Sequence, residues 1–224
     1  MSKLIIGNWK MNGSIPLLNA FIDSIHCENF VLAVPNVFVA YSHMKDKFLK
    51  LAAQDCSIFQ GCGARTGEIS ADILKESGAE FIILGHSERR ALSSFDGIDS
   101  IYKKLNNSIK AGLKVILCVA ENFNKLLDKN TSEFIINNIE NIYIAFEPIS
   151  AIGSGKAASL QEIVDTLNAI KSKFSGIKCI YGGSVNSENS AEILTLESVD
   201  GVLIGGSSLR LGEMKAILGC DAQV

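Results

Sequence analysis

Three side chains that could carry acid–base chemistry stand far apart in the sequence: Lys10, His86 and Glu147. Glu147 ends an apolar run and is followed at once by Pro148, within the stretch AFEPISAIGSGK. A carboxylate can remove a proton beside a carbonyl group, a neutral imidazole can donate a hydrogen bond to the developing oxyanion, and an ammonium group can stabilise its charge. Each residue alone is equally well read as a surface or structural residue. Together they indicate proton transfer next to a carbonyl, which requires neither a metal nor an organic cofactor.

The apolar pattern predicts the elements that must position these residues. Short runs rich in Ile, Val and Leu recur, with apolar side chains at successive positions, as is typical of strands buried on both faces of a parallel sheet. Eight such runs are LIIGN from Leu4, FVLAV from Phe30, LAAQ from Leu51, FIILG from Phe81, KVILCV from Lys114, IYIAF from Ile142, IKCIY from Ile177 and GVLIG from Gly201.

Segments with helical spacing separate these runs. The clearest is Ser159–Phe174, where apolar residues recur every three or four positions, and Leu92–Ala111 and Asn122–Ile139 are similar. The alternation predicts an α/β fold, a (β/α)8 or TIM barrel of eight parallel strands with outer helices, in which residues 1–224 form one catalytic domain. A doubly wound open sheet is the alternative. It usually has fewer strands, and its GxGxxG fingerprint is missing from the sequence.

Two glycine-rich turns follow the last two predicted strands. Gly182-Gly183-Ser184 follows the seventh run and Gly205-Gly206-Ser207 the eighth. Glycine lets backbone N–H groups approach an anion closely, and a helix beginning just after Gly206 would add its positive end. Barrels often bind phosphate in these two loops. One such pair could simply form a tight turn, but two in consecutive loops predict a phosphate site beside Lys10, His86 and Glu147.

Composition limits the classes of function. The chain is 47% apolar and 20% charged, as expected of a folded protein, and its net charge of −3 does not favour nucleic acid or a membrane surface as a partner. No apolar run is long enough for a membrane span, and the N-terminus does not resemble a signal peptide. The six cysteines form no CxxC pair. We therefore expect reduced cysteines, a cytoplasmic location and no metal site.

Six motifs in order resemble the triosephosphate isomerase family along nearly the whole chain. They are GNWKMN (Gly7–Asn12), GARTGE (Gly63–Glu68), LGHSERR (Leu84–Arg90), FEPISAIGSGK (Phe146–Lys156), YGGSV (Tyr181–Val185) and LIGGSSL (Leu203–Leu209). The resemblance implies a cofactor-free interconversion of dihydroxyacetone phosphate and D-glyceraldehyde 3-phosphate through an enediolate, in glycolysis and gluconeogenesis.

The resemblance also implies a role for individual residues. Glu147 would be the base and His86 the electrophile, while Lys10 and Asn8 would bind the substrate. This family is itself a standard example of a glutamate base paired with a neutral histidine. The backbone amides expected to hold the phosphate are those of Gly153, Ser184, Gly205 and Gly206.

Three further residues would support these groups. Glu88 would pair with Lys10, Ser87 would help to open the helix after His86, and Cys118 would lie near the base without reacting. The segment Ile149–Ser154 would be a lid that closes over the substrate.

The family is usually homodimeric, and its third strand–helix loop reaches into the partner. We therefore expect Thr66 to lie close to Asn8 and Lys10 of the other subunit. The sequence departs from the family where Arg65 replaces a common aromatic residue and Ser150 replaces the usual tryptophan of the lid, which predicts a more weakly anchored open lid. Two alternatives are another phosphosugar isomerase and a non-catalytic barrel that binds a phosphate ligand.

Overall fold

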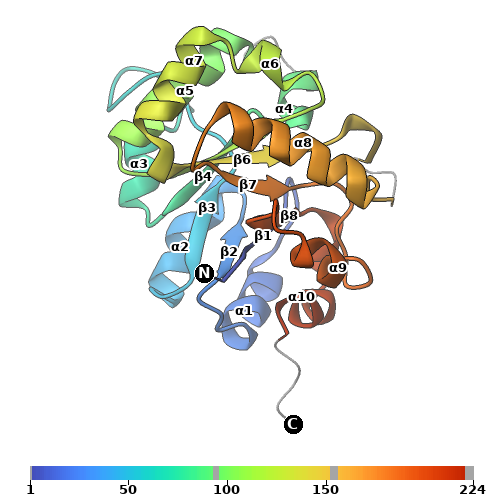
Figure 1. Cartoon of the computed structure of the whole chain (residues 1–224). Helices are drawn as coiled ribbons and strands as arrows, with labels where there is room; N and C mark the ends of the chain where they lie inside the picture. Colours follow the sequence, from blue (N-terminus) through green and yellow to red (C-terminus); the bar gives the residue numbers. More distant parts are fainter. Residues whose placement is uncertain (1, 93–95, 152–155, 220–224) are drawn as a thin grey trace.

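Eight parallel strands form a closed barrel, with neighbours in the order β1-β2-β3-β4-β5-β6-β7-β8 (Figure 1). The computed structural model describes residues 2–92, 96–151 and 156–219, without the side chains of Leu92 and Ser150. The strands are β1 Leu4–Asn8, β2 Phe30–Ala33, β3 Lys50–Ala53, β4 Phe81–Leu84, β5 Lys114–Val119, β6 Ile142–Phe146, β7 Lys178–Tyr181 and β8 Gly201–Ile204. The predicted (β/α)8 barrel is confirmed.

The apolar runs are continuous because each strand buries both of its faces. Ile6 belongs to a cluster that fills the barrel, whereas its neighbour Ile5 belongs to the cluster between the strands and the helices. Phe81 and Ile82 divide between the two clusters in the same way. Alternate residues of a strand point to opposite faces, so a barrel wrapped in helices requires apolar residues at nearly every strand position.

The helices surround the strands (Figure 1). They are α1 Ile15–Ser24, α2 Val39–Lys45, α3 Ala71–Glu76, α4 Ser87–Leu92, α5 Ile98–Lys110, α6 Phe123–Leu126, α7 Lys129–Asn137, α8 Leu160–Lys173, α9 Ser190–Thr195 and α10 Leu211–Leu218. The prediction of a helix over Ser159–Phe174 is confirmed by α8. Ser159 caps its first turn by accepting a hydrogen bond from the backbone N–H of Glu162, and Phe174 is its C-cap.

Two predicted helices are shorter than expected. The pattern over Leu92–Ala111 corresponds to the end of α4 and, after a break, to α5, which begins at Ile98 with Gly97 as its N-cap. The pattern over Asn122–Ile139 covers α6 and α7, because Asp128 has an extended backbone and its carboxylate caps α7 through the N–H of Thr131. Apolar periodicity continues across both breaks and therefore does not reveal them.

One cysteine, Cys27, is not in the reduced state that the sequence predicts. Cys56, Cys62, Cys118 and Cys179 are free, whereas Cys27 is disulfide-bonded, so the prediction of six reduced cysteines is wrong for Cys27. The spacing of cysteines alone does not determine which of them form a bridge. Within the described residues, no helix is both long and apolar enough to cross a membrane.

Candidate active site

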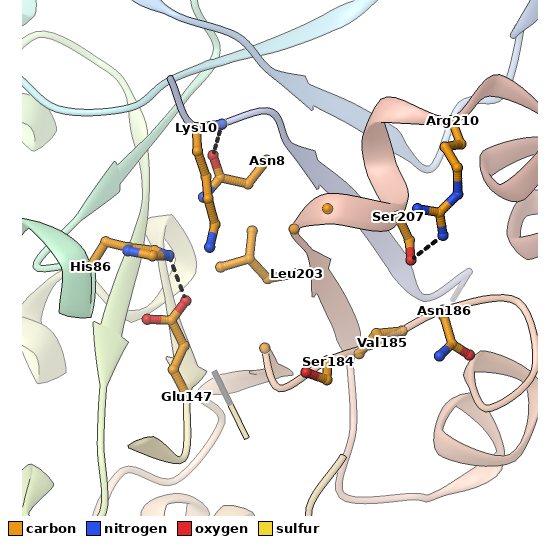
Figure 2. A pocket seen from close by; sticks show the side chains of 13 residues that line it. Asn8, Lys10, His86, Glu147, Ser184, Val185, Asn186, Leu203, Ser207 and Arg210 are labelled. Atoms are coloured by element: carbon orange, nitrogen blue, oxygen red, sulfur yellow. Dashed lines mark hydrogen bonds and ion pairs between the residues drawn. The ribbon is translucent and has the colours of Figure 1, made fainter. Parts of the chain in front are cut away.

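The three candidate acid–base residues converge at the carboxyl ends of the strands (Figure 2). Lys10 follows β1, His86 follows β4 and Glu147 follows β6 directly. They line a cavity of about 290 Å³. The other lining residues are Asn8, Gly182, Ser184, Val185, Asn186, Leu203, Gly205, Gly206, Ser207 and Arg210.

His86 and Glu147 face each other directly. The Nε2 atom of His86 lies 3.0 Å from Oε1 of Glu147 (Figure 2). The backbone N–H of Glu88 donates to Nδ1 of His86 over 3.3 Å. Because Nδ1 accepts a hydrogen bond, it carries no proton, and the geometry assigns the ring proton to Nε2. The imidazole therefore presents an N–H donor to the cavity.

Glu147 is held at the end of β6 with one carboxylate oxygen unused. The residue is 2% exposed, and its backbone N–H donates to the carbonyl of Val119 over 2.8 Å. Among the described residues, Oε2 of Glu147 has no hydrogen-bond partner. A buried carboxylate oxygen without a donor is energetically costly in a structural role but is available to accept a proton.

Lys10 reaches the cavity through an unusual backbone conformation. Its φ angle is +54°, and its N–H donates to Oδ1 of Asn8 over 3.0 Å. The ammonium group lies 2.6 Å from Oε1 of Glu88. Left-handed conformation in a lysine is rare and costs free energy, so the surrounding contacts must maintain it. Asn8 thus positions Lys10 as well as lining the cavity.

The two glycine-rich turns form the opposite wall. Ser184 has a φ of +48°, and its hydroxyl donates to the carbonyl of Ala151 over 2.5 Å. A Cβ atom on Gly183 would lie 2.3 Å from Oη of Tyr181 and 3.0 Å from Cβ of Ala151. The same Tyr181 oxygen accepts a hydrogen bond from the N–H of Ala158 over 2.8 Å. Loop 182–184 therefore contacts Ala151, which belongs to the segment predicted to be the lid, and the adjacent Tyr181 binds Ala158, which follows that segment.

A 3-10 turn stands where an α-helix was expected immediately after Gly206. Gly206–Leu209 forms a 3-10 turn, η5, and α10 begins at Leu211. A Cβ atom on Gly205 would lie 3.4 Å from Cε of Lys10, which places this turn against the lysine. On Gly206 it would meet no described atom within 4 Å. Backbone N–H groups at a 3-10 start can still bind an anion, because they lack intrahelical partners.

The supporting residues are placed as follows. Cys118 is fully buried in β5; burial, reinforced by the nearby Glu147 carboxylate, raises the pKa of its thiol well above the usual range. The thiol is therefore neutral and unreactive. Ser87 begins α4, directly after His86, but its hydroxyl has no partner among the described residues. Thr66 is exposed on the loop between β3 and α3, and Gly153 lies outside the described residues.

The structure adds residues that the motifs did not identify. Arg210 and Asn186 line the cavity, and Glu121 accepts a hydrogen bond from the N–H of Ile149 over 2.9 Å. Arg210 directly follows the motif LIGGSSL, and its proximity to a predicted phosphate turn was a usable signal. The Glu121 contact joins residues 28 positions apart and has no local signature.

Comparisons with known proteins agree with this geometry. A family model described as triosephosphate isomerase matches residues 3–220. A protein named triosephosphate isomerase from Francisella tularensis subsp. holarctica is 34% identical over 247 residues, covering 97% of this chain and 96% of the relative. One from Azoarcus sp. (strain BH72) is 35% identical over 242 residues, covering 96% of this chain and 98% of the relative.

Proposed function

The chain belongs to the triosephosphate isomerase family and is an isomerase, and from this premise we propose that it interconverts dihydroxyacetone phosphate and D-glyceraldehyde 3-phosphate. The observation that carries the proposal is the joint placement of Lys10, His86 and Glu147 around one cavity that also contains the two glycine-rich turns. A proton donor, a proton acceptor and a cation then surround the same small volume. An enediolate reaction needs this set of groups.

In the proposed reaction, Glu147 removes a proton from the carbon beside the substrate carbonyl and returns it to the neighbouring carbon. The Nε2–H of His86 donates to the oxygen that becomes negative, and Lys10 stabilises the same charge. The substrate enters at His86 and Glu147, whose Nε2 and Oε1 atoms lie 3.0 Å apart. The backbone amides of Ser184, Gly205 and Gly206 hold the phosphate, with Gly153 as a fourth from the lid. No step requires a metal or an organic cofactor.

The test is an assay of glyceraldehyde 3-phosphate isomerisation with the wild type and Glu147→Gln. The variant keeps the shape of the side chain but loses its basicity, so kcat should fall by roughly 10²–10⁴-fold. If a folded wild type is inactive on this substrate, another phosphosugar isomerase or a non-catalytic phosphate-binding barrel becomes the better reading. If the variant matches an active wild type, Glu147 is not the base.

We also propose that the enzyme is a cytoplasmic homodimer that serves glycolysis and gluconeogenesis. Exposed apolar side chains on the loops after β1, β2 and β3 support the dimer: Met11 is 96% exposed, Val37 78% and Phe59 41%. A second cavity of about 390 Å³, lined in part by Lys10, His86 and Glu88, opens beside the first. Such a hollow suits the tip of a partner's loop, and Thr66 is the residue that we expect to enter it.

Sedimentation of the wild type and of Thr66→Arg tests this proposal. The wild type should sediment as a dimer, and the bulky charge should raise the dimer dissociation constant and lower activity with it. The control is Lys129→Arg, because the side chain of Lys129 is 87% exposed on α7. Gly176→Ala would be unsuitable, because the φ of +90° at Gly176 disfavours any residue with a Cβ atom. A fully active wild-type monomer contradicts the assignment of Thr66.

A further inference from the structure

Arg210 lies at the end of the active-site cavity opposite the His86–Glu147 pair. Figure 2 shows its side chain beside Ser207, across the cavity from the imidazole and the carboxylate. It lines the same cavity of about 290 Å³, together with Ser184, Gly205 and Gly206. Arg210 is therefore next to the turns that would hold the phosphate and away from the reacting carbons.

Two neighbouring side chains contact the guanidinium of Arg210, whose side chain is 61% exposed. Its Nη2 donates to Oγ of Ser207 over 3.3 Å and lies 3.7 Å from Oε1 of Glu213. Oε2 of Glu213 accepts a hydrogen bond from the backbone N–H of Ser187 over 3.2 Å, and this bond lowers the pKa of the Glu213 carboxyl. Glu213 thus remains ionised and ties Arg210 to the loop after β7. Through these contacts, Arg210 and Glu213 link the turn at Ser207 to Ser187 on the loop after β7.

The charges around the cavity indicate a binding role for Arg210. Its charged lining residues are Lys10, Arg210 and Glu147, in a chain whose net charge is −3. Lys10 is already paired with Glu88 at 2.6 Å, whereas the contact of Arg210 with Glu213 is longer, at 3.7 Å. A phosphate dianion approaching a negatively charged protein needs a local cation, and a guanidinium can offer it two parallel N–H donors.

We propose that Arg210 is a substrate-binding residue that contacts the outer oxygens of the substrate phosphate and attracts the dianion to the cavity. This inference rests on the proposed isomerase function and extends it. Because Arg210 lies away from the reacting carbons, it contributes to binding and leaves the chemical step to Glu147 and His86. Its effect belongs in KM and in the affinity for inorganic phosphate, not in kcat.

The experiment compares Arg210→Gln, Arg210→Lys and the control Lys215→Gln. Lys215 lies on α10, of which Arg210 is the N-cap, and it is not among the described residues that line the cavity. Its variant changes the net charge equally. The assays measure KM and kcat for glyceraldehyde 3-phosphate, and the inhibition constant of inorganic phosphate as a competitive inhibitor. Unphosphorylated glyceraldehyde is the second substrate, and circular dichroism verifies that each variant is folded.

We expect Arg210→Gln to raise KM and the phosphate inhibition constant together by about five- to tenfold, with kcat changed less than twofold, as for the loss of a charged hydrogen bond at a partly exposed site. Arg210→Lys should recover part of the loss. Turnover of unphosphorylated glyceraldehyde should be unchanged, and the KM of Arg210→Gln should depend less on salt.

The inference is overturned if both constants stay within twofold in Arg210→Gln, if Lys215→Gln reproduces the change, or if kcat falls while KM does not. Should Arg210→Gln fail to fold, Arg210→Lys decides the question: its phosphate inhibition constant must lie above that of the wild type, and equality overturns the inference. An inactive wild type would instead refute the proposed isomerase function, so the two failures are distinguishable.

Discussion

The Nε2 atom of His86 lies 3.0 Å from Oε1 of the Glu147 carboxylate, while Nδ1 of the same ring accepts a hydrogen bond from the backbone N–H of Glu88. These two contacts fix the tautomer, because a ring nitrogen that accepts an N–H bond carries no proton. The helix start that supplies the Glu88 N–H therefore determines which proton the site can offer. The backbone N–H of Glu88 thus determines which ring nitrogen of His86 can act as a hydrogen-bond donor.

The tautomer of His86 leads to the first prediction. In ¹⁵N NMR spectra at pH 7, the Nε2 of His86 should be protonated and its Nδ1 should not. The variant His86→Gln should lower kcat by roughly 10²–10⁴-fold, because the donor to the oxyanion is displaced, with little change in unfolding free energy. His26→Gln, at an exposed position of α1's C-terminal loop, should behave like the wild type. A doubly protonated His86 ring would contradict the assignment.

The second prediction concerns Gly183. A methyl group there would overlap Oη of Tyr181 at 2.3 Å and press on Ala151, so Gly183→Ala should disrupt the contact with Ala151 in the predicted lid and the bond from Ala158 to Tyr181. We expect destabilisation by about 1–3 kcal/mol and a fall in kcat/KM of at least about tenfold. Chemical denaturation and steady-state kinetics measure the two effects. Gly212→Ala, whose Cβ would meet no described atom within 4 Å, should fold normally and retain full activity.

A cluster of ion pairs among Asp55, Arg89, Asp96 and Lys104 leads to the third prediction. Lys104 is 3% exposed; its ammonium lies 2.8 Å from Oδ2 of Asp55 and also contacts Asp96. Arg89 bridges the same two carboxylates from α4. Lys104→Met should destabilise the protein by about 3–5 kcal/mol, because it leaves the buried Asp96 and the half-buried Asp55 with one cation fewer.

Its matched control is Lys103→Met, at the exposed neighbouring position of α5. This change should alter the unfolding free energy by less than about 0.5 kcal/mol. Equal midpoints of urea unfolding for the two variants would show that the cluster does not contribute to stability. Asp55 itself has a pKa raised by its burial, although the Lys104 hydrogen bond opposes this shift. The cluster is therefore costly to disrupt without being a strong source of stability.

The fourth prediction is a pH dependence at the start of α7. The backbone N–H of Thr131 donates to Asp128 and lowers the pKa of its carboxyl in the folded protein. The cap therefore stabilises the fold above the ordinary pKa of aspartate, about 4, and the contribution is lost as the pH falls through the lower, folded value. Asp128→Ala should cost about 1 kcal/mol at pH 7.

Denaturation curves at pH 7 and pH 3 measure this dependence. The difference between Asp128→Ala and the wild type should shrink at the lower pH. Asp128→Asn retains an acceptor oxygen without a titrating proton, and its deficit should be smaller and nearly independent of pH. A constant deficit for Asp128→Ala across this range would mean that the ionised carboxylate is not the stabilising form.

Much of this protein was predictable from the sequence because the relevant signals are local or periodic. Strands buried on both faces require continuous apolar runs, so β1, β5 and β6 begin and end where the runs do. Parallel strands carry their following loops to one end of the barrel. The convergence of Lys10, His86 and Glu147 follows from that rule once the strands are placed.

Tertiary structure decided what no local pattern records. The break before α7 depends on a cap at Asp128, and no spacing rule revealed the disulfide at Cys27. The position of Arg210 in the cavity depends on Ser207 and Glu213, which a motif does not place in space. Periodicity reports which side of an element is buried, whereas hydrogen bonds between distant residues fix where each polar group lies. The sequence by itself therefore determined the barrel and its acid–base set, and the packed fold alone decided the tautomer, the supporting ions and the far end of the site.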